Sequence, residues 1–198
     1  FGRIEAVALS HGHWDHAFGN ARFFDVPIWG HVRCAAMLRE RGEAMRVECM
    51  ERYPTNADDF RAVEITAPTD LFEDRATLEL GDRRVELQFL GRGHTDNDIV
   101  VTVPGASVLF AGDLLENAPS PWFGDGYPQE WAITGQALLS LVDGVVVPGH
   151  GEPFGRDFAE RQVADIGELA RLGVEVAAGR LGADAAVRQR PFPADETL

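Results

Sequence analysis

The stretch His11-Gly12-His13-Trp14-Asp15-His16 decides how the rest of the chain is interpreted. It directly follows the largely apolar run 4–9, which is typical of a buried strand that enters a loop. Three histidines and one aspartate lie in this HxHxDH motif, and the chain has only 6 histidines in total. Imidazole nitrogens and carboxylate oxygens are the ligands that hold zinc, iron or manganese in catalytic sites. The stretch therefore predicts a metal site on a loop.

The composition favours a single acidic globular domain. The chain has 198 residues, of which 45% are hydrophobic; this suits one sizeable core but not two ordinary domains, so we expect residues 1–198 to form one domain. The formal net charge is −14, and the 18 cationic residues, all arginine, are not clustered as a phosphate-binding surface requires. No apolar run approaches the roughly 18 residues of a membrane span. We therefore expect no nucleic-acid partner and no membrane partner.

The start of the chain is unusual, because its first residue is Phe1 rather than Met and only residues 1–10 precede the metal motif. We expect the sequence to be a fragment or a processed product. A signal peptide would have been lost with the missing part, so the expected cytoplasmic location leaves secretion open.

Residues 31–52 are predicted to form a helix that ends before Tyr53-Pro54. Cys34 and Cys49 lie on this helix, too far apart along its axis for a disulfide bond, so we expect two free, buried thiols. His31 is interpreted as an ordinary histidine at a helix start rather than as a metal ligand. The apolar residues expected along the helix are Val32, Ala36, Met37, Met45 and Met50.

Three later strand ends also carry a ligand-type residue beside glycine. The run 87–90 leads into Gly93-His94, the run 107–111 into Gly112-Asp113, and the run 144–147 into Gly149-His150. Glycine lets the backbone turn close to a ligand, while the strand behind it stays rigid. We therefore expect the four strand ends to share one site at an edge of a sheet.

The remaining segments alternate between short β-like runs and helical patterns. Strands are predicted at 26–30, 63–66, 76–80 and 85–90, with Gly81-Asp82 as a turn in an antiparallel piece of sheet. Helical patterns cover 129–142 and 157–179, and residues 181–198 are expected to be a frayed tail. The apolar face expected for the second helix consists of Phe158, Val163, Ile166, Leu169, Ala170 and Val174.

The four motifs, in this order, resemble those of the metallo-β-lactamase-fold hydrolase superfamily. The resemblance runs from His11 to about Gly151 and implies an α/β (α+β) fold, an αββα sandwich with a metal site at one sheet edge. In that family several strands precede the first motif. Because only residues 1–10 do so here, we expect an N-terminally incomplete record of an active protein.

The resemblance also implies a ligand set for two metal ions. His11, His13 and His94 would hold the first ion, and Asp15, His16 and His150 the second, with Asp113 bridging the two. Two ions about 3.5 to 4 Å apart can share a water and lower its pKa towards neutrality. The expected cofactors are two Zn²⁺, with iron or manganese as alternatives, and the residual positive charge favours an anionic small-molecule substrate.

Further residues near the motifs are given narrower roles. Asp15 has a second, catalytic role in orienting the attacking water and accepting its proton. Thr95 and Asn97 are candidates for orienting the ligands, and Trp14 for packing or a pocket wall. A ligand pocket and plain packing are both open interpretations for Trp122, Phe123 and Tyr127.

The sequence ranks the activities of the family without choosing a substrate. The acidic charge disfavours nucleic-acid processing, His13 stands where oxygen-reducing diiron members have glutamate, and no cysteine adjoins Asp113 as in β-lactamases with a cysteine ligand. Glyoxalase-II-like and lactonase-like hydrolysis of thioesters, lactones or small esters remains. The alternatives are a mononuclear iron dioxygenase acting on a persulfide through His11, His94 and Asp113, and an inactive binding module. Oligomeric state is left open.

Overall fold

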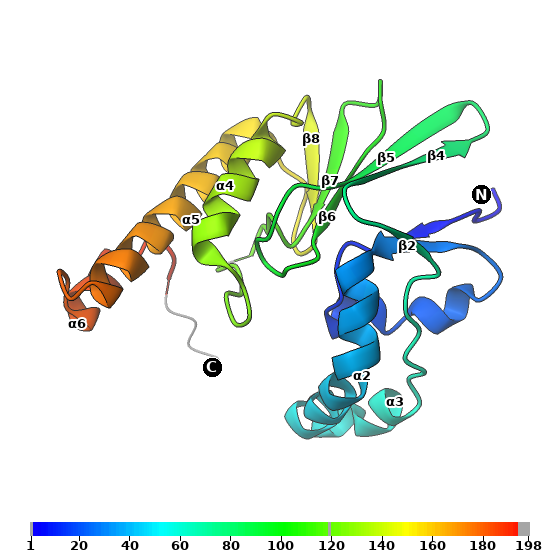
Figure 1. Ribbon diagram of the computed structural model, residues 1–198, viewed down its shortest axis with the longest axis horizontal. Helices are drawn as coiled ribbons and strands as arrows, with labels where there is room; N and C mark the ends of the chain where they lie inside the picture. The colour runs from blue at the N-terminus through cyan, green and yellow to red at the C-terminus, as the bar shows by residue number, and fades with distance from the viewer. Residues whose placement is uncertain (1, 119, 194–198) are drawn as a thin grey trace.

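The computed structural model describes residues 2–118 and 120–193, which form two β-sheets flanked by helices (Figure 1). The smaller sheet has the order β1-β2-β3 and is parallel throughout. The larger sheet has the order β4-β5-β6-β7-β8, antiparallel except for its last pair, β7 and β8. The strands are β1 (Val7–Ala8), β2 (Ile28–His31), β3 (Asp70–Phe72), β4 (Arg75–Leu80), β5 (Arg83–Phe89), β6 (Ile99–Thr102), β7 (Val108–Gly112) and β8 (Val145–Pro148).

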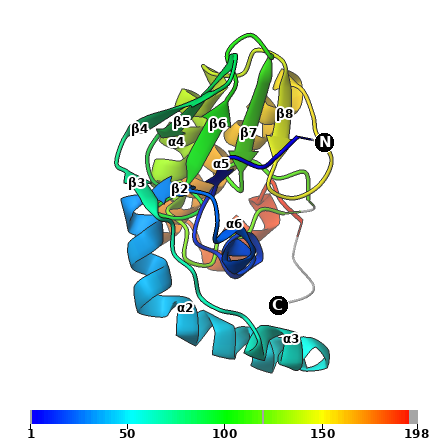
Figure 2. The same ribbon diagram turned by 90° about the vertical axis from the view of Figure 1, so that its right-hand side faces the viewer.

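Helices cover the outer faces of both sheets. In Figure 1, α4 and α5 run side by side along the larger sheet, while α2 extends from the end of β2 beside the smaller one, as Figure 2 also shows. Two short 3-10 helices, Asn20–Phe23 and Pro54–Asn56, precede β2 and α3. The α-helices are α1 (Trp14–Ala17), α2 (Val32–Arg52), α3 (Ala57–Arg61), α4 (Pro128–Leu139), α5 (Arg156–Ala177) and α6 (Ala183–Gln189).

Three apolar clusters lie between successive layers and define the sandwich. On β2, successive side chains point to opposite faces, so Ile28 packs towards α2 while Trp29 packs towards the larger sheet. On β7, Leu109 and Ala111 face α4 and α5. The predicted αββα sandwich is confirmed. The buried residues between the two sheets are Phe72, Leu78, Leu87 and Ile99.

The predicted strand at 63–66 is wrong, and β3 and β6 were not predicted. Residues 63–68 have no strand partner; the side chain of Ile65 instead packs on α2, where a Cβ at Gly42 would lie 2.6 Å from it. Residues 63–66 are half-buried or exposed and lie outside the sheet, and the backbone joins β2 from Thr69 onward, where the Thr69 amide donates to the Ile28 carbonyl. The strands predicted at 76–80 and 85–90 are confirmed as β4 and β5, with the turn at Gly81-Asp82 between them.

The buried face of α2 differs from the apolar residues picked from the sequence. Of those five residues only Met45 is buried, and the other buried positions include the small or sulfur-containing Cys34, Gly42 and Cys49. Both cysteines are free and buried, as predicted. His31 caps α2, where its Nδ1 accepts a hydrogen bond from the Arg33 amide, so its interpretation as a helix-start histidine is confirmed.

The C-terminal helices bring two further corrections. Val174 was assigned to the apolar face of α5 but is 43% exposed, whereas Gln162 is buried there. Within the predicted frayed tail, residues 183–189 form α6 and Phe192 packs against the core beside α4 and α5. Residues 194–198 of that tail lie outside the described residues. Among the described residues, no helix is long and apolar enough to cross a membrane.

The packing of α5 on the sheet predicts a stability difference between two isoleucines. Ile166 on α5 is 1% exposed, whereas Ile133 on α4 is 72% exposed. Ile166→Ala should lower the free energy of unfolding by about 2–5 kcal/mol, because it leaves a cavity in the core. Urea unfolding measures the change. Ile133→Ala is the matched control, expected within about 0.5 kcal/mol of wild type, and equal losses in the two variants would contradict the described packing.

Candidate metal centre

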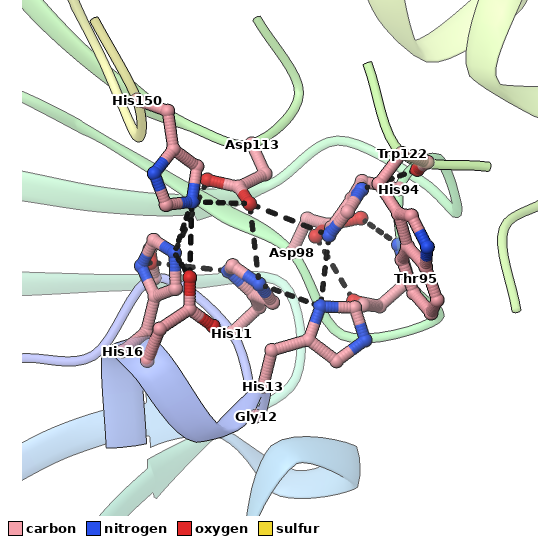
Figure 3. Close-up of polar contacts among 12 residues, drawn as sticks. His11, Gly12, His13, His16, His94, Thr95, Asp98, Asp113, Trp122 and His150 are labelled. Carbon is pink, nitrogen blue, oxygen red and sulfur yellow. Dashed lines mark hydrogen bonds and ion pairs between the residues drawn. The ribbon is translucent and has the colours of Figure 1, made fainter. Parts of the chain in front are cut away.

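Three buried histidines form the first donor group, and they come from two loops. His11 and His13 follow β1, and His94 follows β5 (Figure 3). His13 Nδ1 lies 3.1 Å from His11 Nε2 and 2.8 Å from His94 Nε2. Three ring nitrogens therefore converge on one point, an arrangement that suits a single cation.

The second donor group lies beside the first and is more open to solvent. Asp15 and His16 belong to α1, and His150 follows β8. His150 Nε2 lies 3.0 Å from Asp15 Oδ2 and 3.4 Å from His16 Nε2. The side chain of His150 is 45% exposed, so this group faces the entrance of the site.

Asp113 lies between the two groups. Its Oδ2 is 3.5 Å from His94 Nε2 and 3.4 Å from His150 Nε2, and its Oδ1 is 3.3 Å from His16 Nε2. The carboxylate is buried, yet Oδ1 has no hydrogen bond among the described residues. A buried carboxylate oxygen without a partner is costly unless a cation compensates it. Asp113 thus lies within reach of a cation held by either group.

Glycines hold the Asp113 carboxylate where it is. Gly112 ends β7 with φ +53, in the left-handed region that glycine adopts without strain, and this turns the chain into Asp113. Gly149 approaches from β8, where its amide donates to the Gly112 carbonyl, and a Cβ at Gly149 would overlap Asp113 Oδ1. The close approach of the two strand ends therefore requires a residue without a side chain at 149.

The second nitrogen of each histidine in the first group also has a partner. His94 Nδ1 is 3.1 Å from the Trp122 carbonyl, His13 Nε2 is 3.2 Å from Asp125 Oδ1, and His11 Nδ1 is 3.2 Å from Ser10 Oγ. Such contacts fix the ring orientation and keep the opposite nitrogen available as a donor. Sequence reasoning missed Ser10 and Asp125. Ser10 adjoins the motif, but nothing local marks Asp125, which lies 112 residues from His13.

The electrostatics separate the two groups. Burial, together with the neighbouring histidines, places the pKa of His11 well below its ordinary value, and burial lowers the pKa of His94 to about 4. Burial also opposes charge on His16, but the nearby carboxylates of Asp113 and Asp15 outweigh this and raise its pKa to about 10. The two aspartates therefore favour a positive charge between them.

The donor set fits divalent metal ions. Nitrogen and carboxylate oxygen donors converge in two groups, and the unpartnered Asp113 oxygen lies between them. The structure brings together all seven residues to which the resemblance assigned metals; their individual roles as ligands stay a prediction. The groups of metal-binding side chains found among the described residues contain no cysteine.

The other residues singled out in the sequence have varied placements. Asn97 Oδ1 accepts a hydrogen bond from the Gly12 amide at 2.9 Å and so fixes the first metal loop. Thr95 contacts Asp98, a buried carboxylate that organises the second loop, and does not reach a histidine of the centre. Trp14 packs against Tyr53 and Phe60 and also lines the cavity described next.

A cavity of about 310 Å³ opens beside the donors and extends along α2. Trp122 lines it, as the pocket interpretation predicted, but Phe123 does not: its ring packs on Trp131 and Phe192 in the core. Tyr127 lies under the Arg92 guanidinium and lines a neighbouring cavity instead. Outside the metal donors, the lining combines apolar and aromatic side chains with the charged groups Arg41, Glu48 and Arg52 from α2, Glu116 and Asp125.

The fold and the donor set define a metal-binding protein with a four-layer sandwich. A family model described as the metallo-beta-lactamase superfamily matches residues 2–150, and the chain belongs to that superfamily. This confirms the resemblance drawn from the motifs.

Curated relatives and solved structures agree with this assignment. The chain is 38% identical over 157 residues to a "Metallo-beta-lactamase type 2" of Bacillus cereus, a match that covers 76% of the chain and 53% of that protein. A match to "Metallo-beta-lactamase domain-containing protein 1" of Xenopus laevis is 39% identical over 71 residues, covering 31% of the chain and 29% of that protein. The chain thus spans about half or less of the length of these relatives. The fold is similar to that of a metallo-beta-lactamase from Pontibacter korlensis, with a TM-score of 0.66, 20% identity, and coverage of 82% of this chain and 69% of that one.

The contact between Gly149 and Asp113 predicts a metal-binding defect without a change at any donor. Gly149→Ala should push the Asp113 carboxylate away and weaken metal binding by about 10- to 100-fold. Competition with a chromophoric chelator measures the affinity. Gly173→Ala on α5 is the control, since its Cβ would enter open space, and wild-type affinity in both variants would show that the approach of β8 does not position Asp113.

Proposed function

We propose that the protein is a dinuclear metal-dependent hydrolase, with zinc as the metal, that acts on a small ester, thioester or lactone. The observation that carries the proposal is the position of Asp113 between two complete groups of donors. His11, His13 and His94 would hold one ion, Asp15, His16 and His150 the other, and Asp113 would contact both. When bound, such ions lower the pKa of a coordinated water and polarise a substrate carbonyl.

The residues around the centre support hydrolysis through Asp15. Burial raises the pKa of this carboxyl group, but the hydrogen bond and charge of His16 outweigh burial and lower the pKa to about 2. Asp15 is therefore ionised at neutral pH and lines the cavity next to Asp113. From there its Oδ2 can accept a hydrogen bond from a water and orient it towards a bound carbonyl carbon, whereas the low pKa makes Asp15 a weak base for the proton.

The cavity supports a small substrate with an apolar body and an anionic group. Trp14, Tyr53 and Trp122 provide aromatic walls, and Arg41 is an exposed cation at the α2 side of the same cavity. An arginine can pair with a carboxylate in bidentate geometry. The relatives named as β-lactamases make a β-lactam a further substrate to test. The absence of cysteine from the donor groups of the described residues supports the ester, thioester and lactone classes.

A mononuclear iron dioxygenase is the second candidate. Asp113 Oδ2 lies 3.8 Å from His11 Nε2 and 3.5 Å from His94 Nε2, so two histidines and one carboxylate could form the facial set of a non-haem iron site. The second donor group favours the hydrolase, because Asp15, His16 and His150 converge as a further set of donors for a second ion. The same group argues against an inactive binding module.

The proposal predicts the metal content and the effect of removing the bridge. Purified protein loaded with zinc should hold about two ions per chain and hydrolyse a member of a panel of thioesters, lactones, esters and β-lactams. Asp113→Ala should lower the metal content and reduce turnover by about 100-fold or more, the equivalent of several kcal/mol of lost stabilisation. Metal analysis and initial rates measure both effects.

Asp184→Ala on the exposed side of α6 is the control. One iron per chain with thiol-dependent oxygen uptake would reject the hydrolase, and turnover surviving in Asp113→Ala would reject the bridge.

The cavity also predicts a selective role for Arg41. Arg41→Gln should raise KM for an anionic ester or thioester about 10-fold, because it removes a charge-assisted hydrogen bond, and should leave KM for a neutral analogue unchanged. Steady-state kinetics on the pair of substrates tests this. Arg39→Gln, on an exposed position of the same helix, is the control. Equal effects on both substrates would contradict an anion-binding role.

A further inference from the structure

Glu116 lies three residues after Asp113 and belongs to neither of the two donor groups. Its residue is only 5% exposed, and it lines the cavity that contains the donors. One carboxylate oxygen of Glu116, one of Asp113 and a ring nitrogen of His94 all lie within 4.8 Å of one another. A third carboxylate is therefore within reach of an ion held by His94 and Asp113.

One oxygen of the Glu116 carboxylate lacks a protein partner. Its Oε1 is buried and accepts no hydrogen bond among the described residues, a condition it shares with Asp113 Oδ1. Two neighbouring buried carboxylates, each with an unpartnered oxygen, are mutually repulsive and expensive to desolvate. A cation between Glu116 and Asp113 would compensate both oxygens.

The backbone holds Glu116 in this place from both sides. The amide of Glu116 donates to Gln162 Oε1 at 2.8 Å, and Gln162 Nε2 donates to the Glu116 carbonyl at 2.6 Å. Gln162 is the polar residue on the otherwise apolar buried face of α5, and its side chain holds the backbone of Glu116. The next amide, that of Asn117, donates to the carbonyl of His150 at 2.8 Å. The position of Glu116 is therefore fixed by α5 on one side and by the loop of His150 on the other.

We propose that Glu116 is a further metal donor, which binds through Oε1 the ion held by His11, His13 and His94. This inference rests on the metal binding of the proposed function. It also changes the charge of the centre: Asp15, Asp113 and Glu116 together reduce the +4 of two divalent ions to +1, before any water is deprotonated. The attraction of an anionic substrate then depends more on Arg41 and less on the metals.

Glu116→Gln tests the proposal through metal binding rather than turnover. The amide has nearly the same shape but is a poor donor, so we expect a fall in zinc affinity of about 10-fold or more. We also expect a change in the visible absorption spectrum of the cobalt-substituted protein. Glu48→Gln is the matched control, since Glu48 lines the same cavity from the exposed side of α2 and should leave affinity and spectrum unchanged.

The stability of the metal-free protein distinguishes a donor from a structural group. A carboxylate oxygen without a hydrogen-bond partner does not stabilise the metal-free protein. Metal-free Glu116→Gln should therefore unfold at the wild-type temperature or above it. Wild-type zinc affinity and an unchanged cobalt spectrum in Glu116→Gln would overturn the inference, as would a loss of stability in the metal-free variant. Failure of the wild-type protein to bind metal would instead reject the proposed function.

Discussion

The structure depends on one constraint: carboxylates and histidine rings are held close together in a buried place, and two of the carboxylate oxygens have no hydrogen-bond partner among the described residues. Asp113 Oδ1 and Glu116 Oε1 are buried and unpartnered, and three histidine nitrogens meet within hydrogen-bonding distance. Such a concentration of donors is unfavourable by itself and becomes favourable around cations. Keeping these groups in position therefore lowers the free energy of unfolding of the metal-free protein, and metal binding would raise it again.

The sandwich meets this requirement with rigid strands and short glycine turns. The donors stand on loops that follow β1, β5, β7 and β8, and the strands behind them are fixed by three apolar clusters. Gly112 turns the chain into Asp113, and Gly149 admits the second strand end beside it. Around these loops, Ser10, Asn97 and Asp125 hold the histidine rings or the loop backbone by hydrogen bonds. The geometry of the centre thus results from packing that is remote from it.

Much of the site could be predicted from the sequence because its signals are local. His11, His13, Asp15 and His16 lie in one short motif, and His94, Asp113 and His150 each follow an apolar run and a glycine. The strands β4 and β5, with the turn between them, were predicted for the same reason. The prediction failed at the apolar run 63–66, because Ile65 packs on α2 while its backbone has no strand partner. For Phe123, where a pocket and plain packing were both open, only the structure could choose packing in the core.

The sequence by itself determined the kind of chemistry and the layered fold, because the metal-binding side chains, the glycines and the apolar runs lie close together in the chain. The resemblance implied two groups of donors with Asp113 between them, but only the tertiary structure shows that these side chains, which come from four separate loops, lie within reach of one another. It also placed Asp125 and Glu116 beside the donors and Gln162 against the backbone of Glu116. Their significance comes from contacts between segments far apart in the chain and from the loss of solvent around them, and neither is encoded in local spacing.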